Sequence, residues 1–142
     1  MTIGDRQDSI GQDEFVLRRI HRNHCSRDLP RTIHFAAFRP SREDTMGLSV
    51  FRELYVSAAQ VAASGRKPGE YFVARLSVKS LKDLGLTVFP DADLSAPPGH
   101  ALIPELALAE YERDKLRLKD VLLELARLAS QTIVHQALKE CP

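Results

Sequence analysis

Residues 71–78 read YFVARLSV, and this stretch decides the fold class of the chain. Every second side chain in it is apolar, which is typical of a β-strand with one face on a hydrophobic core. The residues that follow, KSLKDLG, predict a short helix that ends at Gly85. A strand that leads directly into a helix indicates a domain that mixes the two. The side chains expected to face the core are Phe72, Ala74, Leu76 and Val78.

Further strand candidates lie on both sides of this stretch. Between them, Ser57 is a suitable N-cap for a short alanine-rich helix, and Gly65 is a suitable residue for its end because glycine adopts a positive φ. The last candidate, after a stiff Pro-Pro-Gly loop, is expected at the edge of the sheet. The segments that predict strands are 15–21 (FVLRRIH), 32–38 (TIHFAAF), 48–55 (LSVFRELY), 86–89 (LTVF) and 100–103 (HALI).

The C-terminal part of the chain predicts helix. Pro104 suits a first helical turn, and residues 105–140 contain neither glycine nor proline. Apolar side chains recur there with the i, i+3, i+4, i+7 spacing of an amphipathic helix. A single helix of this length is unusual in a small domain, so we expect a break within residues 111–116. The apolar positions are Leu118, Val121, Leu122, Leu125, Leu128, Ala129 and Thr132.

Together these elements predict an α+β fold with a small mixed sheet, short helices and a long amphipathic C-terminal helical segment. Strands joined through single helices leave parallel pairs open. The length of 142 residues fits one domain. We place this single globular domain at residues 14–138, between a flexible N-terminal tail at 1–13 and a C-terminal tail at 139–142.

The composition excludes several classes of protein. Hydrophobic residues make up 44% and charged residues 27% of the chain, which rules out a wholly disordered chain, a collagen-like repeat and a disulfide-dense mini-protein. No apolar run has the length of a signal-peptide core or a membrane span, so we expect a cytoplasmic protein with no membrane partner. Cys25 and Cys141 are accordingly expected to be reduced thiols.

Basic residues are unevenly distributed, although the net charge is only +1. Between Phe15 and Arg42 there are seven arginines and a single acid, Asp28. Arginine binds phosphate or carboxylate with two parallel hydrogen bonds, so this region is a candidate anion site or nucleic-acid surface. Pairing with carboxylates elsewhere in the fold would explain the same pattern. The candidate ligand-binding residues are Arg18, Arg19, Arg39, Arg42 and Arg52.

The polar segment 38–53, FRPSREDTMGLSVFRE, is a second candidate region. Long polar loops in small domains are often functional, and Gly47 would let the backbone approach a ligand closely. The alternative is an ordinary connection in which Ser and Asp side chains cap local turns. No Walker or GxGxxG pattern is present, so a phosphate-binding loop of known type is excluded.

Candidate catalytic residues are Ser49, His100 and Glu105. A histidine that follows Pro-Pro-Gly is held by a stiff loop and can act as a general base or a hydrogen-bond donor, and Glu105 is near enough in sequence to orient it. A Ser-His-Asp set can also be written from Ser49, His100 and either Asp91 or Asp93, although there is no GxSxG elbow.

A metal site and a cofactor are not expected. His21, His24 and Cys25 form an HxxHC pattern, but no second cluster completes the four ligands of a structural zinc site. Cys25 in its basic setting is also a possible nucleophile, with no other residue that marks it as one.

The layout is similar to that of small ADP-ribosyltransferase-like domains over about a third of the chain. The similarity rests on an arginine on the first strand (Arg18 or Arg19), a serine on a later strand (Ser49) and a distal acid (Glu105). The glycine and aromatic positions of such domains are not found here. The resemblance implies an enzyme that acts on a nucleotide-like substrate.

Three functional hypotheses follow. The first is a binding module that holds an anionic partner, either nucleic acid or an acidic protein surface, on a flat arginine-rich face. The second is a small enzyme with a nucleotide-like substrate, which requires a concave site that joins Arg39, Ser49, Arg52 and His100. The third is an accessory subunit that binds a protein partner through its C-terminal helix, which requires an exposed leucine stripe.

Overall fold

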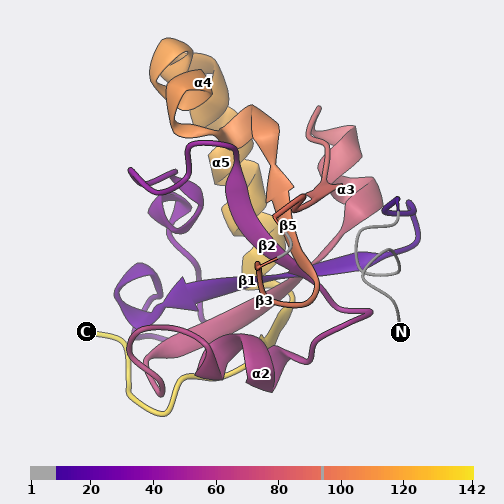
Figure 1. The fold of residues 1–142 in the computed structure, drawn as a ribbon. Coiled ribbons are helices and arrows are strands. Elements are labelled where there is room, and N and C mark those ends of the chain that lie inside the picture. The colour runs from indigo at the N-terminus through magenta and orange to yellow at the C-terminus, as the bar shows by residue number, and fades with distance from the viewer. Residues whose placement is uncertain (1–8, 94) are drawn as a thin grey trace.

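The computed structural model describes residues 9–93 and 95–142. They form a six-stranded sheet in the order β4-β5-β2-β1-β3-β6, in which every described pair of neighbouring strands is antiparallel (Figure 1). The parallel pairing that a mixed sheet requires is therefore not formed. The strands are β1 (Phe15–His21), β2 (Leu48–Arg52), β3 (Tyr71–Ser77), β4 (Phe89–Pro90), β5 (His100–Ile103) and β6 (Ile133–His135).

The helices confirm the α+β class and the long C-terminal helix. The expected break falls at Asp114, which has a non-helical backbone (φ −140°, ψ 44°). In the described residues, no helix combines the length and the apolar character that crossing a bilayer requires. The α-helices are α2 (Ala58–Ala63), α3 (Val78–Asp83), α4 (Leu108–Arg113) and α5 (Lys115–Ser130), and the 3₁₀ helices are η1 (Arg22–His24), η2 (Phe35–Phe38) and η3 (Pro104–Leu106).

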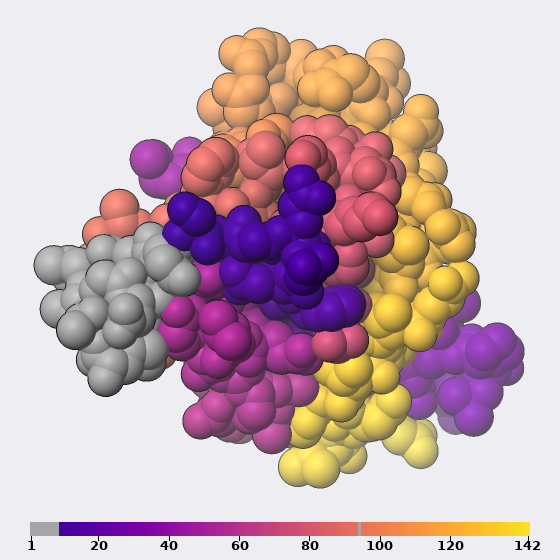
Figure 2. Space-filling model, turned by 90° about the vertical axis from the view of Figure 1, so that its right-hand side faces the viewer, coloured from indigo at the N-terminus to yellow at the C-terminus, as the bar shows by residue number. Residues whose placement is uncertain are grey.

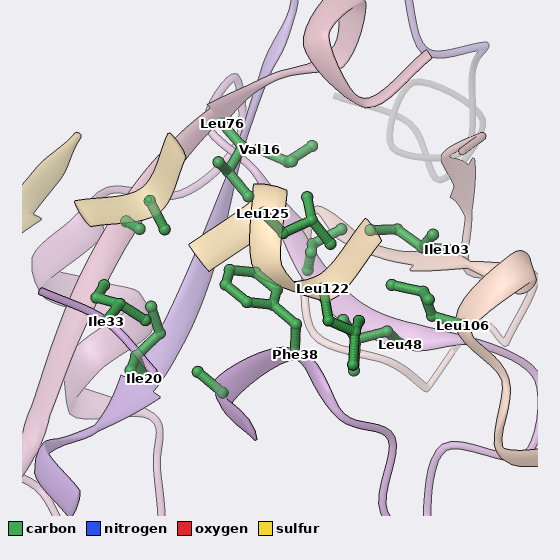
Figure 3. Close-up of a cluster of buried hydrophobic side chains, with 14 of the residues drawn as sticks. Val16, Ile20, Ile33, Phe38, Leu48, Leu76, Ile103, Leu106, Leu122 and Leu125 are labelled. Carbon is green, nitrogen blue, oxygen red and sulfur yellow. The ribbon is translucent and has the colours of Figure 1, made fainter. Parts of the chain in front are cut away.

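The main core lies between one face of the sheet and α5. Leu122 and Leu125 of α5 point into a cluster of side chains from β1, β2, β3, β5 and η2 (Figure 3). Both leucines are fully buried, as the helical spacing predicted. The apolar face predicted for β3 is also confirmed, since Phe72, Ala74 and Leu76 belong to this core.

The opposite face of the sheet is covered by α2. Val61 and Ala62 of this helix pack on Leu17, Phe51 and Val73 of the three central strands. Its predicted N-cap is confirmed. The Ser57 hydroxyl accepts a hydrogen bond from the amide of Gln60, and the Gln60 side chain accepts one from the amide of Ser57.

Gly65, which follows α2, is a glycine for a different reason from the one expected. It is not among the glycines with positive φ. A Cβ at this position would lie 2.2 Å from the ring of Tyr71, so glycine is required because the backbone passes directly over an aromatic ring.

Four sequence predictions about the secondary structure were wrong. Residues 100–103, expected at the edge of the sheet, form β5, which pairs with β4 on one side and β2 on the other because β4 follows as the outer strand. Residues 32–38, expected as a strand, contain η2, because the ring nitrogen Nδ1 of His34 accepts a hydrogen bond from the amide of Ala36 and caps the turn. The expected strand 86–89 is reduced to β4. The helix expected to continue to residue 140 ends at Ser130, and β6 follows and pairs with β3.

The sheet is weakly joined at its centre, between β1 and β2. Only Val16↔Arg52 and Leu17↔Phe51 pair across this joint, whereas β1 pairs with β3 over its full length. Beyond Leu17 the two strands separate, and β2 pairs onward with β5 from Leu48 to Phe51. We call the two residue pairs the seam. The space that opens beyond the seam contains the candidate site.

Both ends of the described chain pack on the domain. Ile10 packs against the core, and the remainder of the expected N-terminal tail, residues 1–8, lies outside the described residues. At the other end, where we expected a tail, Cys141 is buried beside Cys25 and both are free thiols. The C-terminal segment, yellow in Figure 2, runs alongside the magenta region that contains α2, in agreement with the contacts between α2 and β6.

Candidate functional site

A chain of two hydrogen bonds joins an aspartate, a histidine and a serine. The ring nitrogen Nδ1 of His100 lies 2.6 Å from Oδ2 of Asp91, and Nε2 of the same ring lies 3.0 Å from the hydroxyl oxygen of Ser49. His100 and Asp91 keep 16% and 19% of their side-chain surface exposed. This is the arrangement in which a carboxylate orients an imidazole and the imidazole accepts the proton of a serine hydroxyl.

Strand register brings these residues together. Ser49 pairs with Leu102, and Phe51 pairs with His100, so Ser49 and His100 occupy diagonal positions on one face of adjacent strands. The loop before His100 is held in place by two backbone bonds: the amide of Arg52 donates to the carbonyl of Gly99, and the amide of His100 donates to the carbonyl of Pro97. Asp91 follows β4 directly, and its amide donates to the carbonyl of His100.

Asp91 is therefore the partner of His100 among the two acids considered from the sequence. Asp93 accepts hydrogen bonds from the amide and hydroxyl of Ser95 instead. These two hydrogen bonds, of which the one from the Ser95 hydroxyl has the larger effect, hold the pKa of Asp93 below its ordinary value. Asp93 thus stabilises its own turn.

Ser49 lies at the wall of a concave cavity of about 350 Å³, in the space where β1 and β2 separate. We call this cavity the arginine cleft. Its lining includes His21, His24, Ser41 and Tyr71. The charged residues that line it are Arg18, Arg19, Arg39, Arg66, Glu43 and Asp44.

Arg18 holds the cleft open. Its Nη1 donates to the carbonyl of Ser49 (2.8 Å), and its Nη2 and Nε donate to the carbonyl of Ala37 (2.8 and 3.3 Å). The guanidinium therefore bridges β2 and η2 in place of the missing strand pairs. Burial is the main reason that the pKa of Arg18 is lowered to about 10. The negative charge of Asp44 raises this pKa, and the positive charge of Arg19 lowers it further.

Arginines outnumber carboxylates in the cleft by four to two. Glu43 is engaged with Arg66 at 2.8 Å, in a pair that is 84% and 76% exposed and therefore weak. Asp44 accepts hydrogen bonds from the amide and hydroxyl of Ser41. The exposed side chain of Arg39 lies over the ring of Phe35, 5.7 Å from its centre. The lining, which includes Ser49, thus has an excess of positive charge.

The positive charge of the cleft affects the pKa of His24. Burial lowers its pKa, and the nearby charges of His21, His34, Arg18 and Arg39 lower it further. At neutral pH, His24 is therefore a neutral imidazole in the wall of a positively charged cleft.

Among the predicted ligand-binding residues, the structure brings Arg18, Arg19 and Arg39 to the cleft and places Arg52 elsewhere. The side chain of Arg52 is fully buried and forms two hydrogen bonds to Glu14, from Nε at 2.9 Å and from Nη2 at 2.7 Å. Arg42 is exposed and is not part of the cleft lining.

Glu105 is also separate from the site. Its carboxylate accepts hydrogen bonds from the amide and the hydroxyl of Thr87, at 2.8 and 2.6 Å. No hydrogen bond recorded for the described residues joins it to Ser49 or His100. The distal acid of the ADP-ribosyltransferase-like layout therefore has no counterpart at Glu105 in this cleft, although Arg18 and Ser49 of that layout are in contact.

Many arginines of the basic region are bound within the protein. Arg22 pairs with Glu70, Arg31 donates to the carbonyl of Ser26, and Arg19 donates to Ser64. Internal partners thus account for much of the charge density noted in the sequence. The arginine cleft is a local concave site in which arginines outnumber carboxylates.

The cleft lining also includes residues that the sequence did not single out, among them Arg66 and Tyr71. Arg66 and Tyr71 flank the turn before β3, far along the chain from β1. The β1–β3 register, which pairs His21 with Tyr71, brings them into the cleft. No local motif could have identified them.

Comparison of the chain with protein-family models, curated proteins and solved structures finds no match.

Proposed function

We propose that this protein is a small enzyme that binds a nucleotide-like phosphorylated substrate in the arginine cleft and uses Ser49 as a nucleophile toward its phosphoryl group. The observation that carries the proposal is the Asp91–His100–Ser49 hydrogen-bond chain at the wall of a cleft lined mainly by arginines. A nucleophile with a base and an orienting acid, beside an anion site, is the arrangement that group transfer needs.

The chemistry follows from the two hydrogen bonds. Neutral His100, with its Nδ1–H donated to Asp91, accepts the Ser49 proton on Nε2 as the serine oxygen attacks phosphorus. The leaving oxygen then takes that proton from His100. Water, deprotonated by the same imidazole, then attacks the phosphoserine. The P–O bond to Ser49 breaks, the serine oxygen takes the proton back from His100, and phosphate is released. Arg19, Arg39 and Arg66 would neutralise charge on the phosphoryl oxygens.

Concavity favours the enzyme over the other two hypotheses. A binding module for nucleic acid or an acidic protein surface calls for a flat basic face, whereas the arginines around Ser49 line a cleft. A helix-docking subunit calls for an exposed leucine stripe, whereas Leu118, Leu122 and Leu125 of α5 are buried.

The first test separates binding from catalysis. The parent protein is screened by thermal shift with nucleoside mono-, di- and triphosphates and with short RNA and DNA, and the stabilising compounds are incubated to detect released phosphate. We expect stabilisation by a nucleotide together with phosphate release. Ser49→Ala should retain binding and lose turnover, and His100→Ala should lower turnover at least about a hundredfold.

Matched variants control for general damage. Ser95→Ala and His135→Ala remove a serine and a histidine from outside the cleft and should leave turnover unchanged. Binding of nucleotides or nucleic acid without any turnover would favour the binding module. No stabilisation by any of these anions would overturn the proposal.

A further inference from the structure

A second cavity lies near the Asp91–His100–Ser49 hydrogen-bond chain, because its wall includes Phe51, whose ring packs beside the ring of His100. It has a volume of about 250 Å³ and a mainly apolar wall. The apolar wall is formed by Phe51, Tyr55, Val56, Val61, Pro97 and Pro98. We call it the apolar cavity.

Arg19, which lines the arginine cleft, contacts two residues that line the apolar cavity. The ring of Phe51, in the wall of the apolar cavity, lies 5.2 Å from the ring of His100. Arg19, in the wall of the cleft, has its guanidinium carbon 5.9 Å from the centre of the same Phe51 ring. Arg19 also donates a hydrogen bond to the hydroxyl of Ser64, which lines the apolar cavity. Ser49 and Phe51 are two residues apart on one strand face, so the nucleophile is close to both spaces.

The volumes indicate that neither space is a complete site. Pockets for small ligands usually enclose roughly 300–1,000 Å³ and combine a large apolar wall with a few polar groups. The apolar cavity is below this range and lacks charge, whereas the cleft is at its lower end and is rich in charge. Together they have the size and the two-part chemistry of one ligand site.

The wall of the apolar cavity is held in position. The loop that carries Pro97 and Pro98 is bonded to β2 through the carbonyl of Gly99, which accepts from the amide of Arg52. Gly99 has a φ of +79°, and a Cβ there would lie 3.1 Å from Tyr55. A loop packed this closely on Tyr55 is preorganised to enclose a rigid group.

We infer that the apolar cavity binds a flat, uncharged ring attached to the phosphate that the arginine cleft holds, so that the substrate is a phosphate ester of an aromatic or nucleobase-containing group. This inference rests on the proposed function, because the ring is placed relative to Ser49 and the cleft.

The test compares ligands that differ only in the ring. Full-length Ser49→Ala, which does not turn over substrate, is titrated with inorganic phosphate, ethyl phosphate, phenyl phosphate, and purine and pyrimidine nucleoside monophosphates. We expect the ring-bearing phosphates to bind about ten- to a hundredfold more tightly than ethyl phosphate, as burial of one aromatic group predicts. The aryl and nucleoside arms show which ring the cavity prefers.

Substitutions at the cavity show where the preference arises. Val56→Trp, or the milder Val56→Phe should Trp disturb folding, fills the apolar cavity and should abolish the preference for a ring while inorganic phosphate binds as before. Leu54→Trp is the matched control, because Leu54 is two residues away, 66% exposed and outside the cavity lining.

The outcomes separate this inference from the proposed function. Equal affinity for ethyl and ring-bearing phosphates, or a preference that survives Val56→Trp, overturns the apolar-cavity inference and leaves the phosphoryl-transfer proposal in place. If inorganic phosphate and all the esters fail to bind, the proposed function is overturned and the inference with it.

Discussion

Arginine has two separate roles in this chain, and burial distinguishes them. Arg52, a residue of the seam, is fully buried and binds both carboxylate oxygens of Glu14. Arg39 is exposed at the cleft. Sequence alone gives the two residues the same candidate role, because the pattern of charges does not show which guanidinium meets a carboxylate from a distant segment.

Arg52→Ala should therefore lower stability, whereas Arg39→Ala should lower anion binding. Removing one partner of a buried ion pair leaves the other without compensation and costs about 3–5 kcal/mol. We expect a clear fall in melting temperature for Arg52→Ala. For Arg39→Ala we expect an unchanged melting temperature and weaker nucleotide binding, with the larger loss at low salt.

Urea unfolding and nucleotide titration of both variants check this prediction. Arg42→Ala, an exposed arginine outside the cleft lining, should change neither quantity. A stable Arg52→Ala variant that has lost nucleotide binding would contradict the assignment of the two roles.

His24 should report an anion in the cleft. Its pKa is lowered by burial first and then by neighbouring positive charges, including those of Arg18 and Arg39. A bound phosphate would offset the repulsion by those charges, so the pKa of His24 should rise on binding and the complex should take up protons. An NMR titration of the imidazole signals with and without nucleotide measures this shift. A pKa of His24 that stays constant at saturating nucleotide would place the anion elsewhere.

The Asp91–His100–Ser49 hydrogen-bond chain shows how much of a candidate site can be predicted from the sequence. The sequence offers Ser49 and His100, with Asp91 and Asp93 as alternative acids. It contains no GxSxG motif that would show which of these residues act together. The choice depends on the diagonal of Ser49 and His100 across β2 and β5 and on the backbone bond from Asp91 to His100. A shift of one residue in that register would turn Ser49 to the other face.

At the scale of elements, the spacing of apolar residues correctly predicted helices and strands that bury one face. α5 and β3 each put a regular set of apolar side chains on the core, so the spacing alone identified them. Residues 32–38 contain apolar side chains as well, but the capping bond from the amide of Ala36 to His34 creates a 3₁₀ turn there. β6 has only three residues and depends on its pairing with β3. This pairing cannot be predicted from the local sequence.

The burial pattern of α5 makes a prediction for two leucines of the same helix. Leu125→Ala should lower the free energy of unfolding by about 2–5 kcal/mol, because it leaves a cavity in the core. Leu116→Ala should change it by less than about 0.5 kcal/mol, because a surface substitution removes little packing, and Leu116 is 90% exposed. Chemical denaturation of both variants tests the difference, and similar losses would contradict the placement of the helix.

At the scale of the whole molecule, Glu70 ties the turn before β3 to two distant parts of the chain. Its carboxylate binds His21 at 3.0 Å, Arg22 at 3.3 Å and Lys139 at 3.6 Å. Partial burial opposes the charge of Glu70, but the hydrogen bonds from Arg22 and His21 outweigh it, so the pKa of Glu70 is below its ordinary value of 4.5.

Stability should therefore fall at acid pH. The folded chain binds a proton at Glu70 less readily than the unfolded chain does, so this stabilisation is complete above the unfolded pKa and is lost as the pH falls through the folded one. Melting temperatures measured from pH 7 to pH 3 should fall less steeply for Glu70→Gln than for the parent. Glu112→Gln, at an exposed position, should follow the parent curve.

The seam divides the sheet into two halves of three strands, β4-β5-β2 and β1-β3-β6, joined through Val16↔Arg52 and Leu17↔Phe51. Ser49 and His100 belong to the first half, and Arg19 and Tyr71 in the cleft belong to the second. A small hinge rotation about the joint would change the separation of Ser49 from Arg19 while every strand pair within each half stays intact. The two residue pairs of the seam, one of which includes the Phe51 ring beside His100, thereby set the separation between Ser49 and the cleft arginines of β1.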